Sequence, residues 1–341
     1  MYLISLKKPV RAALAAVIML LAGLAAFAQN ELTASLPNEK AASTPDYTPV
    51  IKKSQQVVRI TGVRFAYPLV QRWIDEFNKE FPDIQLVIEA RGSTDPSQYE
   101  LLIEAYEHDA EFRKNREYAS VARYAILPVA NSKSGIANEF SEKGLDKDLL
   151  VQLFFHDPYS DKQNQREIKS PFTIYTRLQK AGAPITFSRY FGFEQKDVKG
   201  KSIAGADEHI LKSVLRDSTA LSYLPLSLIY DHATQRPVNG ISVLPVDLNG
   251  NGKVNDEEKF YQDLAAVLER FEKTGPKDLN NVPIEYLHFS VDKGNAKPEA
   301  VAFVRWVIAN GQRYLHEYGY LNPEPERLAK DKSDLFASKG K

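Results

Sequence analysis

The chain of 341 residues has 43% hydrophobic and 26% charged residues, which is typical of a folded protein with a sizeable core and room for two domains. Its 44 basic and 44 acidic side chains cancel, so neither a nucleic-acid partner nor a basic membrane-binding face is expected. The absence of cysteine excludes a disulfide framework and a lipid-attachment cysteine.

The N-terminal stretch has the parts of a secretion signal. Three basic residues precede an apolar run over residues 12–24, and Ala26 and Ala28 supply the small residues of a signal peptidase site. We therefore predict a cleaved signal peptide at residues 1–28 and export of the mature chain. Residues 29–55 are rich in Ser, Thr, Pro, Asn and Ala without sustained periodicity, which indicates a flexible linker.

The first folded unit changes its periodicity at a glycine. Residues 57–61 read as a short β-branched strand, and the apolar residues after Pro68 recur at helical spacing. The turn at residues 62–67 therefore joins a strand to a helix start. Unpaired N–H groups and the positive end of the helix dipole can hold an anion there, close to Thr61 and Arg64, although most such units bind nothing.

This order of strand, turn and helix is expected to repeat. Residues 84–89 alternate as a second strand, residues 90–95 form a turn, and Pro96 opens a helical segment that continues through Tyr106. An open parallel sheet, with ligands at the C-terminal ends of its strands, requires this order.

Further strands and helices are expected along the rest of the chain. The strands fall at residues 124–129, 174–177, 220–225 and 243–246. Helices are predicted at residues 207–216 and from Pro298 onward, and residues 145–155 read as a short helix or strand. The aromatic pairs at residues 154–155 and 190–191 are expected in the core.

The most specific motif is a twelve-residue loop over residues 247–258. It matches the EF-hand calcium loop, with oxygen-bearing side chains at positions one, three, five and nine, glycine at position six and glutamate at position twelve. Calcium prefers six to eight oxygen ligands, which such a wrapped loop can present. The predicted ligands are Asp247, Asn249, Asn251, the main-chain carbonyl of Lys253, Asn255 and Glu258.

Only the outgoing half of an EF-hand is expected around this loop. Residues 243–246 read as a strand, and residues 257–273 as the helix that follows. A lone loop of this kind is predicted to be a structural clamp of weak affinity, roughly 10⁻⁴ to 10⁻³ M, with a plain Asn-Gly turn as the alternative.

Together these segments resemble the phosphate-type periplasmic substrate-binding proteins of ABC transporters. The resemblance is carried by ITGVRFAYPLVQRWIDEFNKEFPDIQLVIEARGST, GKSIAGADEHILKSVLRDSTALSYLPLSL and KPEAVAFVRWVIANGQRYLHEYGYLNP. It implies an α/β fold of two lobes, each a mixed sheet flanked by helices, joined by a two-strand hinge around an oxyanion cleft. The expected division places lobe 1 at residues 56–128 plus 226–330, lobe 2 at 129–225 and a tail at 331–341.

The resemblance also implies three anion-binding loops. The first is formed by Thr61, Gly62, Val63, Arg64 and Phe65, the second by Gly92, Ser93 and Thr94, and the third follows the strand that contains Thr176 and Arg177. Where the family carries Ser-Gly-Thr in the third loop, this chain has Gln-Lys-Ala-Gly-Ala at residues 179–183, so the hydroxyls are missing.

Two functions follow from these patterns. The first is a periplasmic, monomeric solute-binding protein that captures phosphate or a similar oxyanion for an ABC permease, which the retained Arg64 and Arg177 favour. The second, favoured by the missing hydroxyls, is a calcium-stabilised interaction module of a cell-envelope complex with a degenerate cleft. No enzyme is expected, because the histidines have no ligand spacing and nucleotide and nucleophile motifs are missing.

Overall fold

The computed structural model describes residues 56–89, 95, 98–106, 108–157, 165–275, 279–294 and 296–334. These residues all belong to one unit of the chain. The predicted signal peptide at residues 1–28, the predicted linker at residues 29–55, and Gly92, Ser93 and Thr94 of the second predicted anion loop lie outside the described residues. None of the helices in the described part of the chain is both long and apolar enough to cross a membrane.

The strands form one mixed sheet in the order β2-β1-β3-β9-β4-β7-β5-β6, with β8 pairing to β4 off this path. Their bounds are β1 (Gln56–Gly62), β2 (Ile84–Ile88), β3 (Leu101–Glu104), β4 (Arg116–Asn131), β5 (Thr173–Arg177), β6 (Lys201–Ile203), β7 (Ala220–Pro225), β8 (Ile241–Val243) and β9 (Ile284–Asp292).

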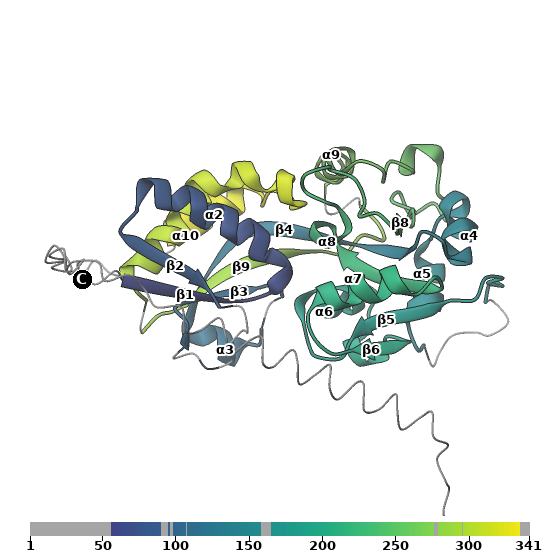
Figure 1. The fold of residues 1–341 in the computed structure, drawn as a ribbon, viewed down its shortest axis with the longest axis horizontal. Coiled ribbons are helices and arrows are strands. Elements are labelled where there is room, and N and C mark those ends of the chain that lie inside the picture. The colour runs from purple at the N-terminus through teal and green to yellow at the C-terminus, as the bar shows by residue number, and fades with distance from the viewer. Residues whose placement is uncertain are drawn as a thin grey trace, which may run out of the picture. The chain divides into compact units, whose positions relative to one another are not determined.

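Helices flank this sheet, and Figure 1 shows α2 and α10 on one face of β1, β3 and β9. The α-helices are α2 (Tyr67–Glu80), α3 (Ala110–Lys114), α4 (Gly135–Lys143), α5 (Lys147–Phe154), α6 (Gly182–Tyr190), α7 (Asp207–Arg216), α8 (Leu226–Ile229), α9 (Leu264–Thr274), α10 (Pro298–Asn310) and α11 (Pro325–Asp334). Short 3-10 helices are η2 (Arg64–Ala66), η5 (Gln195–Asp197), η6 (Asp256–Glu258), η7 (Gly311–Tyr314) and η8 (His316–Tyr318). The predicted α/β class with a mixed, helix-flanked sheet is confirmed.

The long strand β4 joins the two halves of the sheet. Its residues 116–125 pair antiparallel with β9, and its residues 126–130 pair antiparallel with β7. We call β1, β2, β3 and β9 the first half, and β5, β6, β7 and β8 the second half. Almost every residue of β4 is buried. Residues 124–130 form an apolar run without alternation, as expected for a strand covered on both faces, and Arg116, Ser120 and Arg123 are buried polar residues before it.

Local sequence patterns predicted most of the elements that they singled out. The strands at residues 57–61, 84–89, 174–177 and 220–225 and the helix at residues 207–216 are confirmed as β1, β2, β5, β7 and α7. The helix after Pro68 is also confirmed, as α2 with proline in its first turn.

The helix predicted from Pro96 to Tyr106 is wrong. Residues 101–104 form β3, which pairs parallel with β1 and antiparallel with β9. A short apolar run such as Leu101-Leu102-Ile103 does not distinguish a buried strand from a buried helix. The two neighbouring strands decide its conformation.

The chain after residue 226 also departs from the expected pattern. Strand β8 lies at residues 241–243 instead of 243–246, and it pairs with β4 through Val129, Ala130 and Asn131. This pairing places it beside the part of β4 that also pairs with β7. The helix predicted at residues 257–273 is divided into η6 and α9.

Aromatic side chains fill much of the core. In the second half, Phe154 and Phe155 are buried as predicted, and both contact Phe187, whose ring stacks on that of Tyr223 at 3.9 Å. The prediction that Tyr190 is buried is wrong, because its side chain is 41% exposed.

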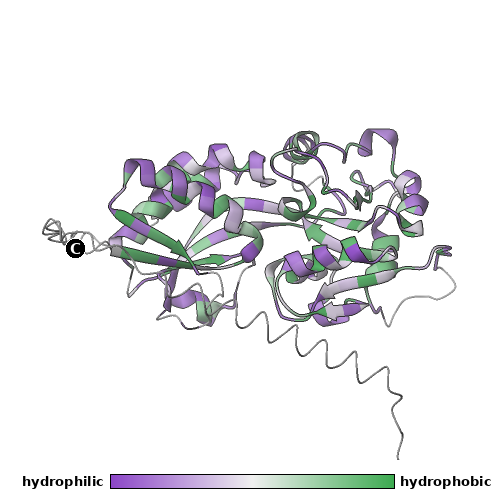
Figure 2. Ribbon diagram, in the orientation of Figure 1, coloured by the Kyte–Doolittle hydropathy of each residue, from purple (hydrophilic) through white to green (hydrophobic). Residues whose placement is uncertain are grey.

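Figure 2 shows strands β1 and β2 in hydrophobic green and a hydrophilic face on α2, as expected for an amphipathic helix on a sheet.

Candidate functional site

A cavity of about 540 Å³ is lined by residues from both halves of the sheet. The first half contributes Gly62, Val63, Arg64, Tyr99, Leu102, Ile103, Glu104, Ala105, Tyr106, His108 and Phe112. The second half contributes Arg177, Gln179, Lys180, Ala181, Gly182, Gly205 and Ala206. The cavity therefore lies at the C-terminal ends of β1, β3 and β5, where open α/β sheets place their ligands.

Three helices begin at the wall of this cavity. The continuous η2–α2 stretch starts after Val63, α6 starts after Ala181 and α7 starts after Ala206, and all three of these residues line the cavity. Neither Val63 nor Ala181 caps its helix with a side chain. The first N–H groups and the positive ends of the helix dipoles therefore favour an anion at this wall.

Basic side chains add to this positive field. Arg64, Arg177 and Lys180 line the cavity, and Arg177 Nη1 donates to Oδ2 of Asp207 at 3.0 Å. Asp207 opens α7 and is 4% exposed, and its burial raises its pKa to about 6 against the opposing effect of Arg177. Arg177 Nε is buried without a hydrogen-bond partner among the described residues, so this guanidinium can still donate to a ligand.

The predicted anion-binding residues separate into two groups. Gly62, Val63, Arg64 and Arg177 line the cavity. Phe65 is 1% exposed with its ring 5.1 Å from that of Tyr124, and Thr61 is buried. The hydroxyl of Thr176 forms a hydrogen bond of 2.6 Å with that of Tyr223. The side chains of Phe65, Thr61 and Thr176 thus lie behind the cavity wall.

The third predicted loop reaches the cavity without hydroxyl groups. Gln179, Lys180, Ala181 and Gly182 line it, directly before and at the start of α6. Gln179 also orders the neighbouring loop, because its Oε1 accepts from the N–H of Gly205 at 3.1 Å. Main-chain N–H groups at a helix start therefore stand where the family carries hydroxyls.

Sequence reasoning missed the acidic residue of this cavity. Glu104 is the last residue of β3, and it is 3% exposed. Ser290 Oγ donates to Glu104 Oε1, and Arg116 Nε lies 3.8 Å from the same oxygen. Its Oε2 lies 3.6 Å from His108 Nε2. Burial raises the pKa of Glu104, opposed by Ser290, Arg116 and Tyr118. The Tyr118 hydroxyl is near, but Oε2 has no partner in hydrogen-bond geometry among the described residues.

Aromatic rings form the adjoining part of the lining. The Tyr106 and His108 rings lie 4.4 Å apart, and those of His108 and Phe112 lie 4.3 Å apart. Arg116 lies over the rings of Phe112 and Tyr99, at 5.6 Å and 5.7 Å from their centroids. The false helix prediction over residues 96–106 concealed this wall, because Tyr99 and Tyr106 lie on either side of the strand β3 that occupies this stretch instead.

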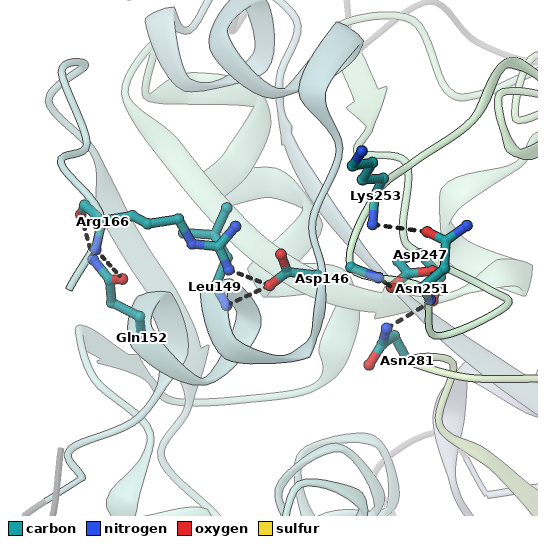
Figure 3. Close-up of polar contacts among 9 residues, drawn as sticks. Asp146, Leu149, Gln152, Arg166, Asp247, Asn251, Lys253 and Asn281 are labelled. Carbon is teal, nitrogen blue, oxygen red and sulfur yellow. Dashed lines mark hydrogen bonds and ion pairs between the residues drawn. The ribbon is translucent and has the colours of Figure 1, made fainter. Parts of the chain in front are cut away.

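The loop at residues 247–258 folds around two buried carboxylates. Asp247 accepts from the N–H groups of Gly250 at 2.8 Å and Gly252 at 2.7 Å. Glu258 accepts from Leu248 N–H at 2.7 Å and Asn255 N–H at 2.8 Å. Figure 3 shows Asp247 and Asn251 within the loop.

The two carboxylates of this loop are buried, whereas its asparagines Asn249, Asn251 and Asn255 are exposed. Asp247 is 2% exposed and Glu258 1% exposed, and neither forms an ion pair with a side chain among the described residues. The other predicted ligands are three asparagines and a carbonyl group. No group of three or more His, Asp or Glu side chains that could hold a metal occurs in the described part of the chain.

Neighbouring segments anchor the same loop. Asn281 Nδ2 donates to the main-chain oxygen of Asp247 at 2.7 Å, a contact visible in Figure 3, and Asn280 Nδ2 donates to that of Leu248 at 3.2 Å. The N–H of Asn281 in turn donates to the Tyr190 hydroxyl of α6 at 2.8 Å. The loop is therefore tied to the helix that begins at the cavity.

No protein-family model and no curated protein matches this chain. Solved structures do resemble it. One is a protein from Clostridium perfringens assigned as a phosphate ABC transporter substrate-binding protein, with bound phosphate; it is 15% identical, with a TM-score of 0.59 over 79% of this chain and 100% of that chain. An ABC-type phosphate transport receptor from Vibrio cholerae is 12% identical, with a TM-score of 0.52 over 79% and 100%. At these identities the likeness establishes the periplasmic-binding-protein-like fold.

Proposed function

We propose that this protein is an extracytoplasmic solute-binding protein that captures phosphate or a similar small oxyanion and delivers it to an ABC permease. The meeting of three helix starts with Arg64, Arg177 and Lys180 at one cavity carries the proposal. Its fold is that of proteins described as phosphate receptors. The predicted signal peptide supports a periplasmic location, where the mature chain would act as a monomer.

The physical basis is a dense set of donors in a partly desolvated site. Each helix start favours an anion by roughly 0.3 to 1 kcal/mol, and each charge-assisted hydrogen bond by roughly 1.5 to 3 kcal/mol. Main-chain N–H groups at the start of α6 would replace the hydroxyls that residues 179–183 lack. The ionised oxygens of an oxyanion accept from a main-chain N–H as they accept from a hydroxyl.

One observation favours the alternative of a calcium-stabilised envelope module with a degenerate cleft. Asp207 already engages Arg177, so an anion must share that guanidinium with a buried carboxylate. Burial raises the pKa of Asp207 to about 6, so most of this carboxyl is still ionised near neutrality and keeps its ion pair with Arg177. We nevertheless favour oxyanion capture, because the helix starts and Lys180 add further favourable groups at the same cavity.

Calorimetric titration of residues 29–341 with inorganic phosphate tests the capture function. Saturable binding is expected, and Arg177→Ala is expected to weaken it by about tenfold or more, because a charge-assisted hydrogen bond is lost. Lys180→Ala, at an exposed position, is expected to weaken it without affecting folding.

The matched control is Arg166→Ala, since Arg166 also pairs with an aspartate, Asp146, but lines a different cavity. It is expected to leave phosphate affinity unchanged. The absence of binding by phosphate, sulfate and other oxyanions to the folded protein would contradict oxyanion capture and leave the envelope-module alternative.

We also propose that residues 247–258 bind one calcium ion that stabilises the fold. Two buried carboxylates support this, because among the described residues only main-chain N–H groups compensate their charge, and a bound cation would neutralise it. Asp247, Asn249, Asn251, Lys253 through its carbonyl, Asn255 and Glu258 would be the ligands. The hydrogen bonds now made by the two carboxylates keep their oxygens inside the loop.

Thermal unfolding with calcium and with a chelator tests this site. Calcium at 10 to 100 times its dissociation constant is expected to raise Tm by roughly 3 to 8 °C. Glu258→Gln should remove most of this rise, whereas Glu257→Gln, at the exposed neighbouring position, should retain it. Equal Tm values for the unmodified chain in calcium and in chelator would contradict calcium binding.

A further inference from the structure

We infer that the cavity takes a phosphate monoester of a hydroxyl-bearing organic group in preference to inorganic phosphate. This inference rests on the proposed capture of an oxyanion and names its substrate class. The phosphate group would occupy the wall formed by the helix starts, and the organic group would lie against residues 99–112.

The size of the cavity exceeds the needs of one inorganic ion. Inorganic phosphate has five heavy atoms, whereas a cavity of about 540 Å³ lies within the range of pockets for drug-sized organic ligands. The helix starts and Arg177 account for only part of the lining. A separate part, without arginine or lysine on the cavity surface, remains for other ligand atoms.

This second part of the lining is aromatic. Tyr99, Tyr106, His108 and Phe112 come from one stretch around β3 and α3 and all line the cavity. Aromatic faces contribute little to the binding of a compact oxyanion, because they have no strong donors. They are suited to the carbon skeleton of an organic group, whose burial against them is favourable.

Glu104 supplies a polar acceptor beside these rings. Its Oε2 is buried, lies 3.6 Å from His108 Nε2 and has no partner in hydrogen-bond geometry among the described residues, a condition that costs roughly 1 to 3 kcal/mol. A ligand donor placed there would remove that cost. The donor is expected to be a neutral hydroxyl rather than an ammonium, because Arg116 already lies 3.8 Å from Glu104 and over the rings of Tyr99 and Phe112.

Titration of residues 29–341 with three probes tests the inference: inorganic phosphate, methyl phosphate and glycerol 3-phosphate. Glycerol 3-phosphate is expected to bind about tenfold or more tightly than inorganic phosphate, with methyl phosphate weaker than glycerol 3-phosphate. Glu104→Leu should bring the affinities of glycerol 3-phosphate and inorganic phosphate close together. Tyr106→Ala, at a partly exposed position, should also bring these two affinities close together, and it replaces Glu104→Leu in the test if that variant fails to fold.

Phe81→Ala is the control, since Phe81 is an exposed aromatic residue outside the cavity. It should leave all three affinities unchanged. Binding of inorganic phosphate as tightly as glycerol 3-phosphate would overturn the inference and leave oxyanion capture intact. Equal affinities for methyl phosphate and glycerol 3-phosphate would overturn the hydroxyl requirement. Failure of every probe to bind would overturn both this inference and the proposed function.

Discussion

Replacement of Gly62 by alanine is expected to lower the free energy of unfolding by about 3 to 5 kcal/mol. Gly62 ends β1 at the cavity wall with φ of +129°, a conformation that other residues rarely adopt. A Cβ there would lie 2.1 Å from the main-chain oxygen of Ile103 and 2.7 Å from its nitrogen. These are backbone atoms of β3, so the strand pairing itself would have to move.

Gly192→Ala is a control that measures the cost of a positive φ at alanine without a steric clash. Gly192 has φ of +86°, but a Cβ there would have nothing within 4 Å. This control is expected to lose only about 1 to 2 kcal/mol, the cost of a left-handed conformation. Denaturant unfolding measures both variants, and equal losses would contradict the role of the β1–β3 contact. Because Gly62 also lines the cavity, phosphate binding to Gly62→Ala is expected to weaken.

Acid is expected to destabilise the protein through one buried histidine. His288 on β9 is 2% exposed, and its Nδ1 lies 3.4 Å from Ser120 Oγ on β4. Burial lowers the pKa of His288 to about 3, with smaller effects in the same direction from Arg327 and Arg113.

Several polar groups face this histidine without pairing with it. The ring of Tyr118 from β4 lies 6.0 Å away and that of Tyr286 from β9 lies 5.7 Å away. On α11, Arg327 Nε donates to Ser120 Oγ and Asp331 accepts from Ser120 N–H at 2.7 Å. The Asp331 carboxylate, which could have stabilised a protonated His288, thus accepts a hydrogen bond from a main-chain N–H.

The direction of the pH effect follows from the two protonation states. Below pH 6.5 the unfolded chain protonates this imidazole, whereas the folded chain resists protonation until the pH approaches 3. Folding stability therefore falls as the pH falls, by about 1.4 kcal/mol for each unit in this window. The expected loss from this group between pH 7 and pH 5 is about 2 kcal/mol.

Denaturant unfolding at pH 7 and pH 5 measures this loss. His288→Gln cannot titrate, so its loss between the two pH values should be smaller than that of the unmodified chain by about 2 kcal/mol. Ser120→Ala serves as the control, because it perturbs the same buried cluster and removes no titrating group. It should lower stability similarly at both pH values. An unchanged pH-dependent loss in His288→Gln would show that this histidine does not cause it.

Local patterns were enough to predict the first strand, turn and helix of the candidate site. The strand, glycine turn and helix at residues 57–81 are confirmed, because periodicity, glycine and proline act within a few residues of one another. The sequence also placed Arg177 at the end of a strand, and it lines the cavity. The spacing of residues 247–258 predicts calcium ligands by the same local logic.

Contacts between distant segments decided the rest. Residues 101–104 became β3 because β1 and β9 lie on either side of them, and this change placed Glu104 and Tyr106 at the cavity. The pairing of Arg177 with Asp207 likewise joins a strand to a helix 30 residues later. From the sequence alone the α/β class and the first strand, turn and helix could be predicted, and the calcium-type spacing could be recognised, since these depend on neighbouring residues. Only the tertiary structure decided the acidic and aromatic part of the cavity, because strand pairing and burial depend on residues far apart in the chain.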